Sequence, residues 1–165
     1  MNCTVCAPVS ETHGSPQDHT HKMPGHWLLA KLGKRVLRPG GLELTRVMLD
    51  RLAINARDSV VEFAPGLGVT ARMTLSRQPL SYTAVERDEA AAAEVGSYLA
   101  GPHQRCQLGS AEQTGLLDQS ATVVYGEAML TMQGAEQKRR IVGRGVPVAE
   151  ARRALWHPRI EPHAR

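Results

Sequence analysis

The stretch from residue 59 to residue 71 reads SVVEFAPGLGVTA and decides the fold class of this chain. Residues 60–63 are mostly apolar and β-branched, which predicts a short buried strand. A turn that contains Gly66 and Gly68 comes next, followed by residues able to begin a helix. A strand that leads through a glycine turn into a helix is typical of the phosphate- or nucleoside-binding corner of an open α/β sheet.

Two glycines and an acid carry the chemistry of this corner. A side chain at Gly66 or Gly68 would stand where a ligand must approach the backbone. Glu62 lies four residues before Gly66, at the end of the predicted strand. Residues 66–71 also fit the G-x-G-x-x-A pattern of nicotinamide and flavin folds, and short glycine patterns occur in turns that bind nothing.

A second acid lies at the distance expected across one βαβ unit. Residues 81–86, SYTAVE, predict a strand that ends at Glu86, which follows Gly66 by 20 residues. A carboxylate at this position can accept hydrogen bonds from both hydroxyls of a ribose. We therefore expect Glu86 to bind a sugar rather than to be one more solvated acid of the charged run 86–89.

Two later segments continue the pattern. Residues 105–108 predict a third strand that leads into Gly109, and residues 121–125 are apolar and β-branched, which predicts a buried parallel strand. Tyr125 and Glu127 would lie at its carboxyl end, where open α/β sheets bind ligands. We expect the methionines after Glu127 to pack in the core rather than to contact substrate.

Residues 26–143 resemble class I S-adenosyl-L-methionine (SAM) dependent methyltransferases in the order and spacing of these segments. The nearest type is the small-molecule group labelled methyltransferase domain 11, or UbiE-like. The acid before the glycines favours this family over nicotinamide proteins, whose strand at this position seldom ends in an acid. The resemblance implies an α/β fold with a Rossmann-like open parallel sheet, and SAM as the cofactor.

The resemblance also assigns roles to individual residues. The cofactor-binding residues that it implies are Glu62, Ala64, Pro65, Gly66, Gly68, Glu86, Arg87, Ser110 and Ala111. Glu62 would orient the glycine loop or approach the methionine ammonium group. Ser110 stands where the family usually has an acid that accepts a hydrogen bond from the adenine amino group, and a hydroxyl accepts this bond more weakly.

The substrate side is assigned to Tyr125 and Glu127. The expected reaction is methyl transfer to a small-molecule or lipid-like acceptor. We assign no catalytic residue, because in-line transfer from a sulfonium requires alignment and exclusion of water rather than a dedicated base.

The sequence divides into a leader, a domain and a tail. Residues 1–24 are rich in Pro, Ser, Gly and Thr, and we expect a disordered leader. Cys3 and Cys6 are followed by several histidines, but the spacing matches no strong zinc template, so we expect no metal site. Residues 25–143 form the expected methyltransferase domain, which begins with helices over residues 26–36 and 42–52.

The character of the sequence changes at Arg144. Pro147 interrupts the helix expected from Gly134, and the prolines after Trp156 predict no strand. A one-base shift of the reading frame over residues 144–162 can yield the turn and fifth strand that the family has here. We hypothesise that residues 144–165 are a frameshifted, non-native tail, so that strands five to seven of the family's sheet are missing.

Such a truncation would have two consequences. The strand over residues 121–125 would become an exposed apolar edge, which permits self-association. Part of the substrate pocket would be missing, so the chain could be inactive. An NAD(P)-binding oxidoreductase fragment and a non-catalytic remnant or interaction module therefore stay open as alternative functions.

Composition excludes several other classes. The 165 residues carry a formal net charge of +4, with basic residues spread along the chain, which gives little support to nucleic-acid binding. The sequence contains no apolar run long enough to span a bilayer and no apolar core of a signal peptide. We therefore expect a cytoplasmic protein.

Overall fold

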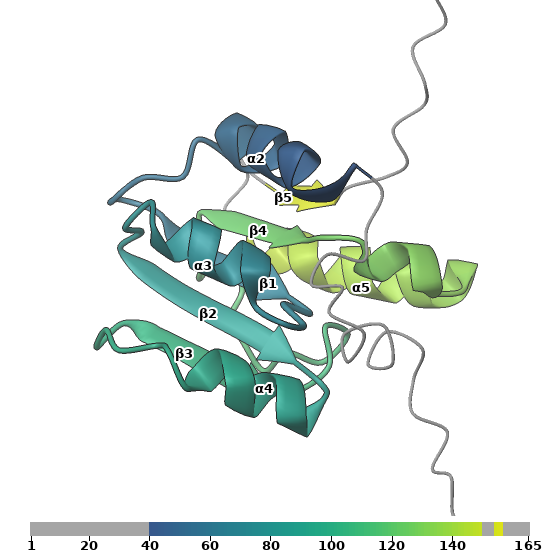
Figure 1. Cartoon of the computed structure of the whole chain (residues 1–165). Helices are drawn as coiled ribbons and strands as arrows, with labels where there is room; N and C mark the ends of the chain where they lie inside the picture. Colours follow the sequence, from purple (N-terminus) through teal and green to yellow (C-terminus); the bar gives the residue numbers. More distant parts are fainter. Residues whose placement is uncertain (1–39, 150–153, 157–165) are drawn as a thin grey trace, which may run out of the picture.

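A computed structural model describes residues 40–149 and 154–156 of the chain, and Figure 1 shows their arrangement. The elements in chain order are α2 (Gly41–Leu52), β1 (Ser59–Phe63), α3 (Val69–Leu75), β2 (Ser81–Glu86), α4 (Glu89–Gly96), β3 (Gln104–Leu108), β4 (Val123–Gly126), the 3-10 helix η1 (Met129–Met132), α5 (Ala135–Val148) and β5 (Ala154–Trp156). The helices α3 and α4 alternate with β1, β2 and β3, whereas a segment without a helix joins β3 to β4.

The strands form one parallel sheet in the order β3-β2-β1-β4-β5. The central strand β1 is paired on one side with β2 and on the other with β4, so the chain reverses its direction of winding at β1. Ligands bind at the carboxyl ends of the strands beside such a switch point. The predicted Rossmann-like open parallel α/β sheet is therefore confirmed.

The two faces of the sheet have separate cores because side chains alternate along each strand. Val60, Tyr82 and Tyr125 are buried on the face that contacts α2, α3 and α4. Val61 and Val124 are buried on the opposite face, against α5. Figure 1 shows the sheet between these two layers of helices.

The end of the sheet corrects the prediction that no fifth strand follows β4. β5 pairs in parallel with β4 over three residues, so β4 is an interior strand rather than an exposed edge. Pro147 also fails to interrupt α5, which continues to Val148. The carbonyl oxygens of Pro147 and Val148 accept hydrogen bonds from the backbone N–H groups of Gln119 and Ala121, and these tertiary bonds hold the last turn despite the proline.

Of the predicted domain boundaries, the one between residues 143 and 144 lies within the described residues, and it falls inside α5. The leader over residues 1–24 and the helix over residues 26–36 lie outside the described residues. That the tail is non-native stays a prediction, which the gene sequence tests. Within residues 40–149 and 154–156, no helix has the length and apolar character needed to cross a membrane.

Candidate functional site: a cavity at the carboxyl end of the sheet

A cavity of about 420 Å³ opens at the carboxyl ends of β1 to β4. Its walls are the loops after these four strands together with one side of α5. A cavity of this size and position suits one small ligand. Of the predicted cofactor residues, seven line the cavity: Ala64, Pro65, Gly66, Glu86, Arg87, Ser110 and Ala111.

The loop after β1 brings its backbone to the cavity wall. Gly66 has φ +56°, and a Cβ built on it meets no atom within 4 Å, so the missing side chain leaves space in the cavity. Ala64 also has a positive φ, +53°, although it carries a side chain. A left-handed alanine costs about 1 kcal/mol, so this turn is held in place by its surroundings.

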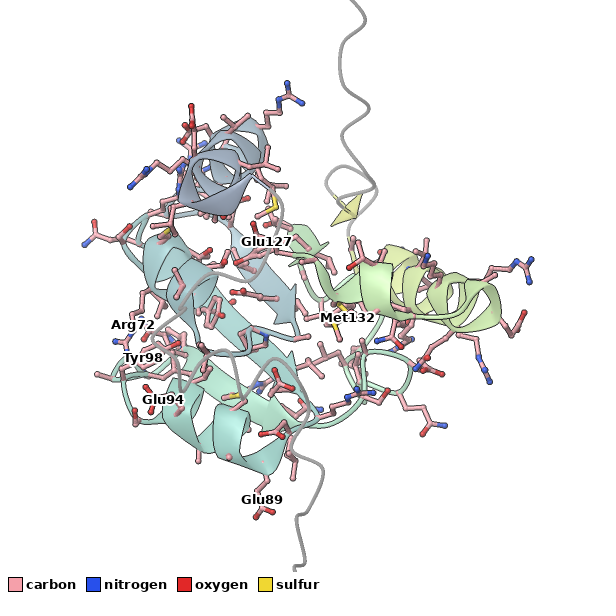
Figure 2. All side chains as sticks on the ribbon, turned by 45° about the vertical axis from the view of Figure 1, so that its right-hand side comes forward. Arg72, Glu89, Glu94, Tyr98, Glu127 and Met132 are labelled. Carbon is pink, nitrogen blue, oxygen red and sulfur yellow. The ribbon has the colours of Figure 1, made fainter. Side chains whose placement is uncertain are left out.

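Gly68 has a different reason to be glycine from the one predicted. It does not line the cavity; a Cβ on Gly68 would lie 1.9 Å from the hydroxyl oxygen of Tyr98. That hydroxyl donates a 3.3 Å hydrogen bond to the carbonyl oxygen of Gly68. Arg72 stacks on the Tyr98 ring at 3.6 Å and lies 3.7 Å from a carboxylate oxygen of Glu94. Figure 2 shows these three side chains together between α3 and α4.

Glu86 lies at the wall of the cavity and is only 5% exposed. Its Oε2 accepts a hydrogen bond from the N–H of Gly66 at 3.0 Å. Its Oε1 accepts two more, from the N–H groups of Arg87 and Asp88. A carboxylate has about four acceptor positions, so one position remains, on Oε2. The structure thus leaves Glu86 able to accept one hydroxyl rather than the two that we expected.

Glu62 does not line the cavity, and its predicted role, to orient the glycine loop or approach the methionine ammonium group, stays a prediction. It is 1% exposed, and its Oε2 accepts hydrogen bonds from the hydroxyls of Tyr82 at 2.6 Å and Tyr125 at 2.7 Å. The physical reason is the strand register: Glu62 is paired with Ala84 and lies on the face covered by α3. Glu62 therefore belongs to the core.

Tyr125 is likewise not among the residues that line the cavity, so its predicted place on the substrate side stays a prediction. Its hydroxyl is buried between Glu62 and the hydroxyl of Thr74, with oxygens 2.6 Å apart in the second contact. Burial, followed by the charge of Glu62, raises the pKa of Tyr82 and Tyr125 well above the usual value. Both hydroxyls are therefore neutral donors near neutral pH.

Glu127 does line the cavity, just after β4. Its two carboxylate oxygens accept hydrogen bonds from the hydroxyls of Thr45 at 2.7 Å and Thr70 at 2.6 Å. These threonines come from α2 and α3, so Glu127 links three elements at the end of the cavity. Figure 2 shows it under α2, with Met132 on the side of α5.

Several cavity residues were not predicted from the sequence. Met129 and Met132 line the cavity. Met129 also packs against a core cluster, as expected, whereas Met132 is 74% exposed, so the expectation of packing is wrong for Met132 alone. Gln133, Gln137 and Ile141 line the cavity from the end of η1 and from α5. Their spacing of four residues is the signal that could have identified one face of a helix.

Within the described part of the chain, no group of three His, Cys, Asp or Glu residues could hold a metal. Cys3 and Cys6 lie outside it.

The strand order, the reversal of winding at β1 and the cavity beside it define a Rossmann-like fold. Comparison with solved structures identifies it as the fold of class I methyltransferases. A proposed SAM-dependent methyltransferase from Methanococcus maripaludis has a TM-score of 0.56 at 9% identity, and 65% of this chain aligns with 49% of that one. A proposed sarcosine dimethylglycine methyltransferase from Galdieria sulphuraria has a TM-score of 0.56 at 11% identity, over 66% of this chain and 42% of that one.

The fold alone leaves the reaction open. The [4+2]-cyclase SpnF has a TM-score of 0.57 at 13% identity, over 66% of this chain and 40% of that one. Among curated sequences, an uncharacterised protein of Haemophilus influenzae is 31% identical over 122 residues. That alignment covers 72% of this chain and 49% of the relative, so the chain spans about half the length of the protein that it matches. No family model matches the chain.

Proposed function

We propose that this protein binds SAM in the cavity and donates its methyl group to a small-molecule or lipid-like acceptor. The observation that carries the proposal is the pairing of an open glycine with a fixed carboxylate. Gly66 leaves room for a ligand to approach the backbone, and its own N–H holds Glu86 at the cavity wall. Both line the cavity beside the reversal point of the sheet: Gly66 comes from the loop after β1, and Glu86 is the last residue of β2.

The residues present fit SAM in chemical terms. The remaining acceptor position of Glu86 suits a ribose hydroxyl. Ser110 and Ala111 line the cavity beyond it, where a base would lie past the sugar. When bound, SAM supplies an electrophilic methyl group on a sulfonium. The role of the protein is then to align this group with the acceptor and to exclude water, for which no catalytic base is required.

We assign the acceptor side to the opposite end of the cavity. Glu127 and the two methionines, Met129 and Met132, line that end. The carboxylate is oriented by two hydroxyl donors and supplies a polar anchor, whereas the thioethers supply an adaptable apolar surface. This combination supports an acceptor with an apolar part and a polar group that donates hydrogen bonds.

Calorimetric titration of the purified, monodisperse chain with SAM, S-adenosylhomocysteine and NADH tests the proposal. We expect micromolar binding of the two SAM-type ligands and none of NADH. Glu86→Ala should weaken S-adenosylhomocysteine binding at least about tenfold, because a buried polar contact to the sugar is lost. Glu89→Ala is the matched control, since Glu89 is exposed on α4 and does not line the cavity.

Three outcomes would reject the proposal. Folded protein that binds neither SAM-type ligand has no such site. Preferential binding of NADH would instead identify a nicotinamide protein. Association that depends on concentration, without any response to ligand, would favour an interaction module.

A further inference from the structure

The loop after β3 and one turn of α5 meet at a polar corner, which we call the β3–α5 corner: Ser110, Glu112, Gln137 and Arg140. The first three residues line the cavity, and Arg140 lies in an adjoining hollow. The first feature of the corner is a side chain held by its neighbours. The amide nitrogen of Gln137 donates a 2.7 Å hydrogen bond to Oε1 of Glu112. The guanidinium of Arg140 lies 3.5 Å from the other carboxylate oxygen. Glu112 is therefore anchored to α5 through both of its oxygens.

The anchored carboxylate determines which way the Gln137 amide faces. Because the amide nitrogen is engaged by Glu112, the amide oxygen is the part of Gln137 left to act as an acceptor. No donor of the described residues reaches this oxygen, although Gln137 lines the cavity. An amide oxygen in a half-buried position without a donor is a place where a ligand's N–H group would gain a hydrogen bond.

Ser110 adds the opposite capability to the same corner. Its hydroxyl oxygen accepts a 3.2 Å hydrogen bond from the backbone N–H of Glu112. The hydroxyl proton has no acceptor among residues 40–149 and 154–156, so it is available as a donor. The β3–α5 corner thus offers an acceptor on the amide oxygen of Gln137 and a donor on Ser110, beside the second N–H of the Gln137 amide.

We propose that Gln137 recognises the adenine of the cofactor by accepting a hydrogen bond from its exocyclic amino group, and that Glu112 is the positioning residue that orients the amide. This inference rests on the proposed function. Adenine presents an amino donor beside a ring-nitrogen acceptor, which matches the acceptor of Gln137 and the donor of Ser110. Hypoxanthine presents a carbonyl beside an N–H group, the reverse pattern. In this proposal the amide of Gln137, on α5, takes the role of the acid that the family usually has at the position of Ser110.

The experiment compares two ligands that differ only in the base: S-adenosylhomocysteine and S-inosylhomocysteine, titrated calorimetrically into the full chain. We expect the parent protein to prefer the adenine ligand by at least about tenfold, since the mismatched base leaves polar groups unpaired. Gln137→Ala should weaken adenine binding by about tenfold and leave hypoxanthine binding nearly unchanged, so that the preference disappears. Lys138→Ala, an exposed neighbour on α5, is the control that should retain the preference.

The variant Glu112→Ala distinguishes the proposed role of Glu112, which is to position the Gln137 amide, from direct contact with the base. Without its anchor the amide can turn over, so this variant should lose most of the preference for adenine while its overall affinity falls less than that of Gln137→Ala. Urea unfolding of each variant verifies that it is folded. A preference that survives Gln137→Ala in folded protein, or a parent with no preference between the bases, overturns the inference while leaving a SAM site intact. Absence of binding by both ligands overturns the proposed function as well.

Discussion

Glu62 and Glu86 come from neighbouring parallel strands and lie on the same face of the sheet, yet they have different roles. Glu86 lies two residues beyond Ala84, the register partner of Glu62, which is about 7 Å along the strand. At the position of Glu62, the helices cover the carboxylate and two tyrosines bind it. At the position of Glu86, the strands end and the carboxylate meets the cavity. A step of two residues along the strand therefore separates a carboxylate buried in the core from one at the cavity wall.

The largest effect expected from the core region is a loss of stability at alkaline pH. Burial and the charge of Glu62 raise the pKa of Tyr82 and Tyr125, whereas both groups lose their protons above about pH 10 in the unfolded chain. The unfolded state then binds fewer protons, so the free energy of unfolding falls as the pH rises, by roughly 3 kcal/mol per pH unit for two tyrosines. Urea unfolding between about pH 9 and about pH 11 measures this slope.

Tyr98 provides the comparison for that slope. Burial, then the charge of Glu62, raises its pKa to about 12, so it contributes in the same direction between the unfolded value and about pH 12. Tyr98→Phe should therefore make the slope shallower. Tyrosinate absorbance that appears before the chain unfolds would contradict the buried network.

Glu62→Ala should produce the next largest effect. It removes the acceptor of two buried hydroxyls and leaves a cavity, so we expect the free energy of unfolding to fall by about 3 kcal/mol. Glu62→Gln keeps one acceptor oxygen and should cost less. S-adenosylhomocysteine affinity should be nearly unchanged in Glu62→Gln; a loss of tenfold or more in folded protein would restore Glu62 as a cofactor contact.

The two glycines of the loop extend the comparison between core and cavity. Gly68→Ala should destabilise the protein by about 2 kcal/mol, since its Cβ would meet Tyr98 and its φ is positive. Tyr98→Ala should relieve part of this cost, so that a double-mutant cycle is less than additive. Gly66→Ala should cost only about 1 kcal/mol of stability but should weaken ligand binding, because its methyl group enters the cavity. Equal effects of the two substitutions on binding would contradict this division.

Ala64→Gly should give the smallest effect, with the opposite sign. Glycine adopts a φ of +53° without steric cost, so the free energy of unfolding should rise by about 1 kcal/mol or less. Ala93→Gly, at an exposed position of α4, is the control and should lower it by about 1 kcal/mol. A loss of stability in Ala64→Gly would show that the turn is not strained.

The sequence was sufficient for the sheet and for much of the cavity, because both depend on local patterns. Gly66 and Glu86 are separated by the spacing of one βαβ unit, and both line the cavity in the structure. The sequence was not sufficient to predict that Glu62 is buried, since the position of an acid along a strand relative to the covering helices depends on strand register and helix packing. The position of Gln137 in the cavity could not be predicted from the sequence either, because it depends on how α5 packs against a loop 25 residues earlier in the chain.

The central place of β1 has a consequence for the synthesis of this protein. One of its two neighbours is β4, and the buried contact between Glu62 and Tyr125 joins residues 63 positions apart. A ribosome adds about 5 to 20 residues per second, so one edge of β1 waits roughly 3 to 13 seconds for its partner. During that interval the nascent chain presents an apolar strand edge that other chains can pair with. The same strand that organises the finished sheet is thus the segment most exposed to misassembly while the protein is being made.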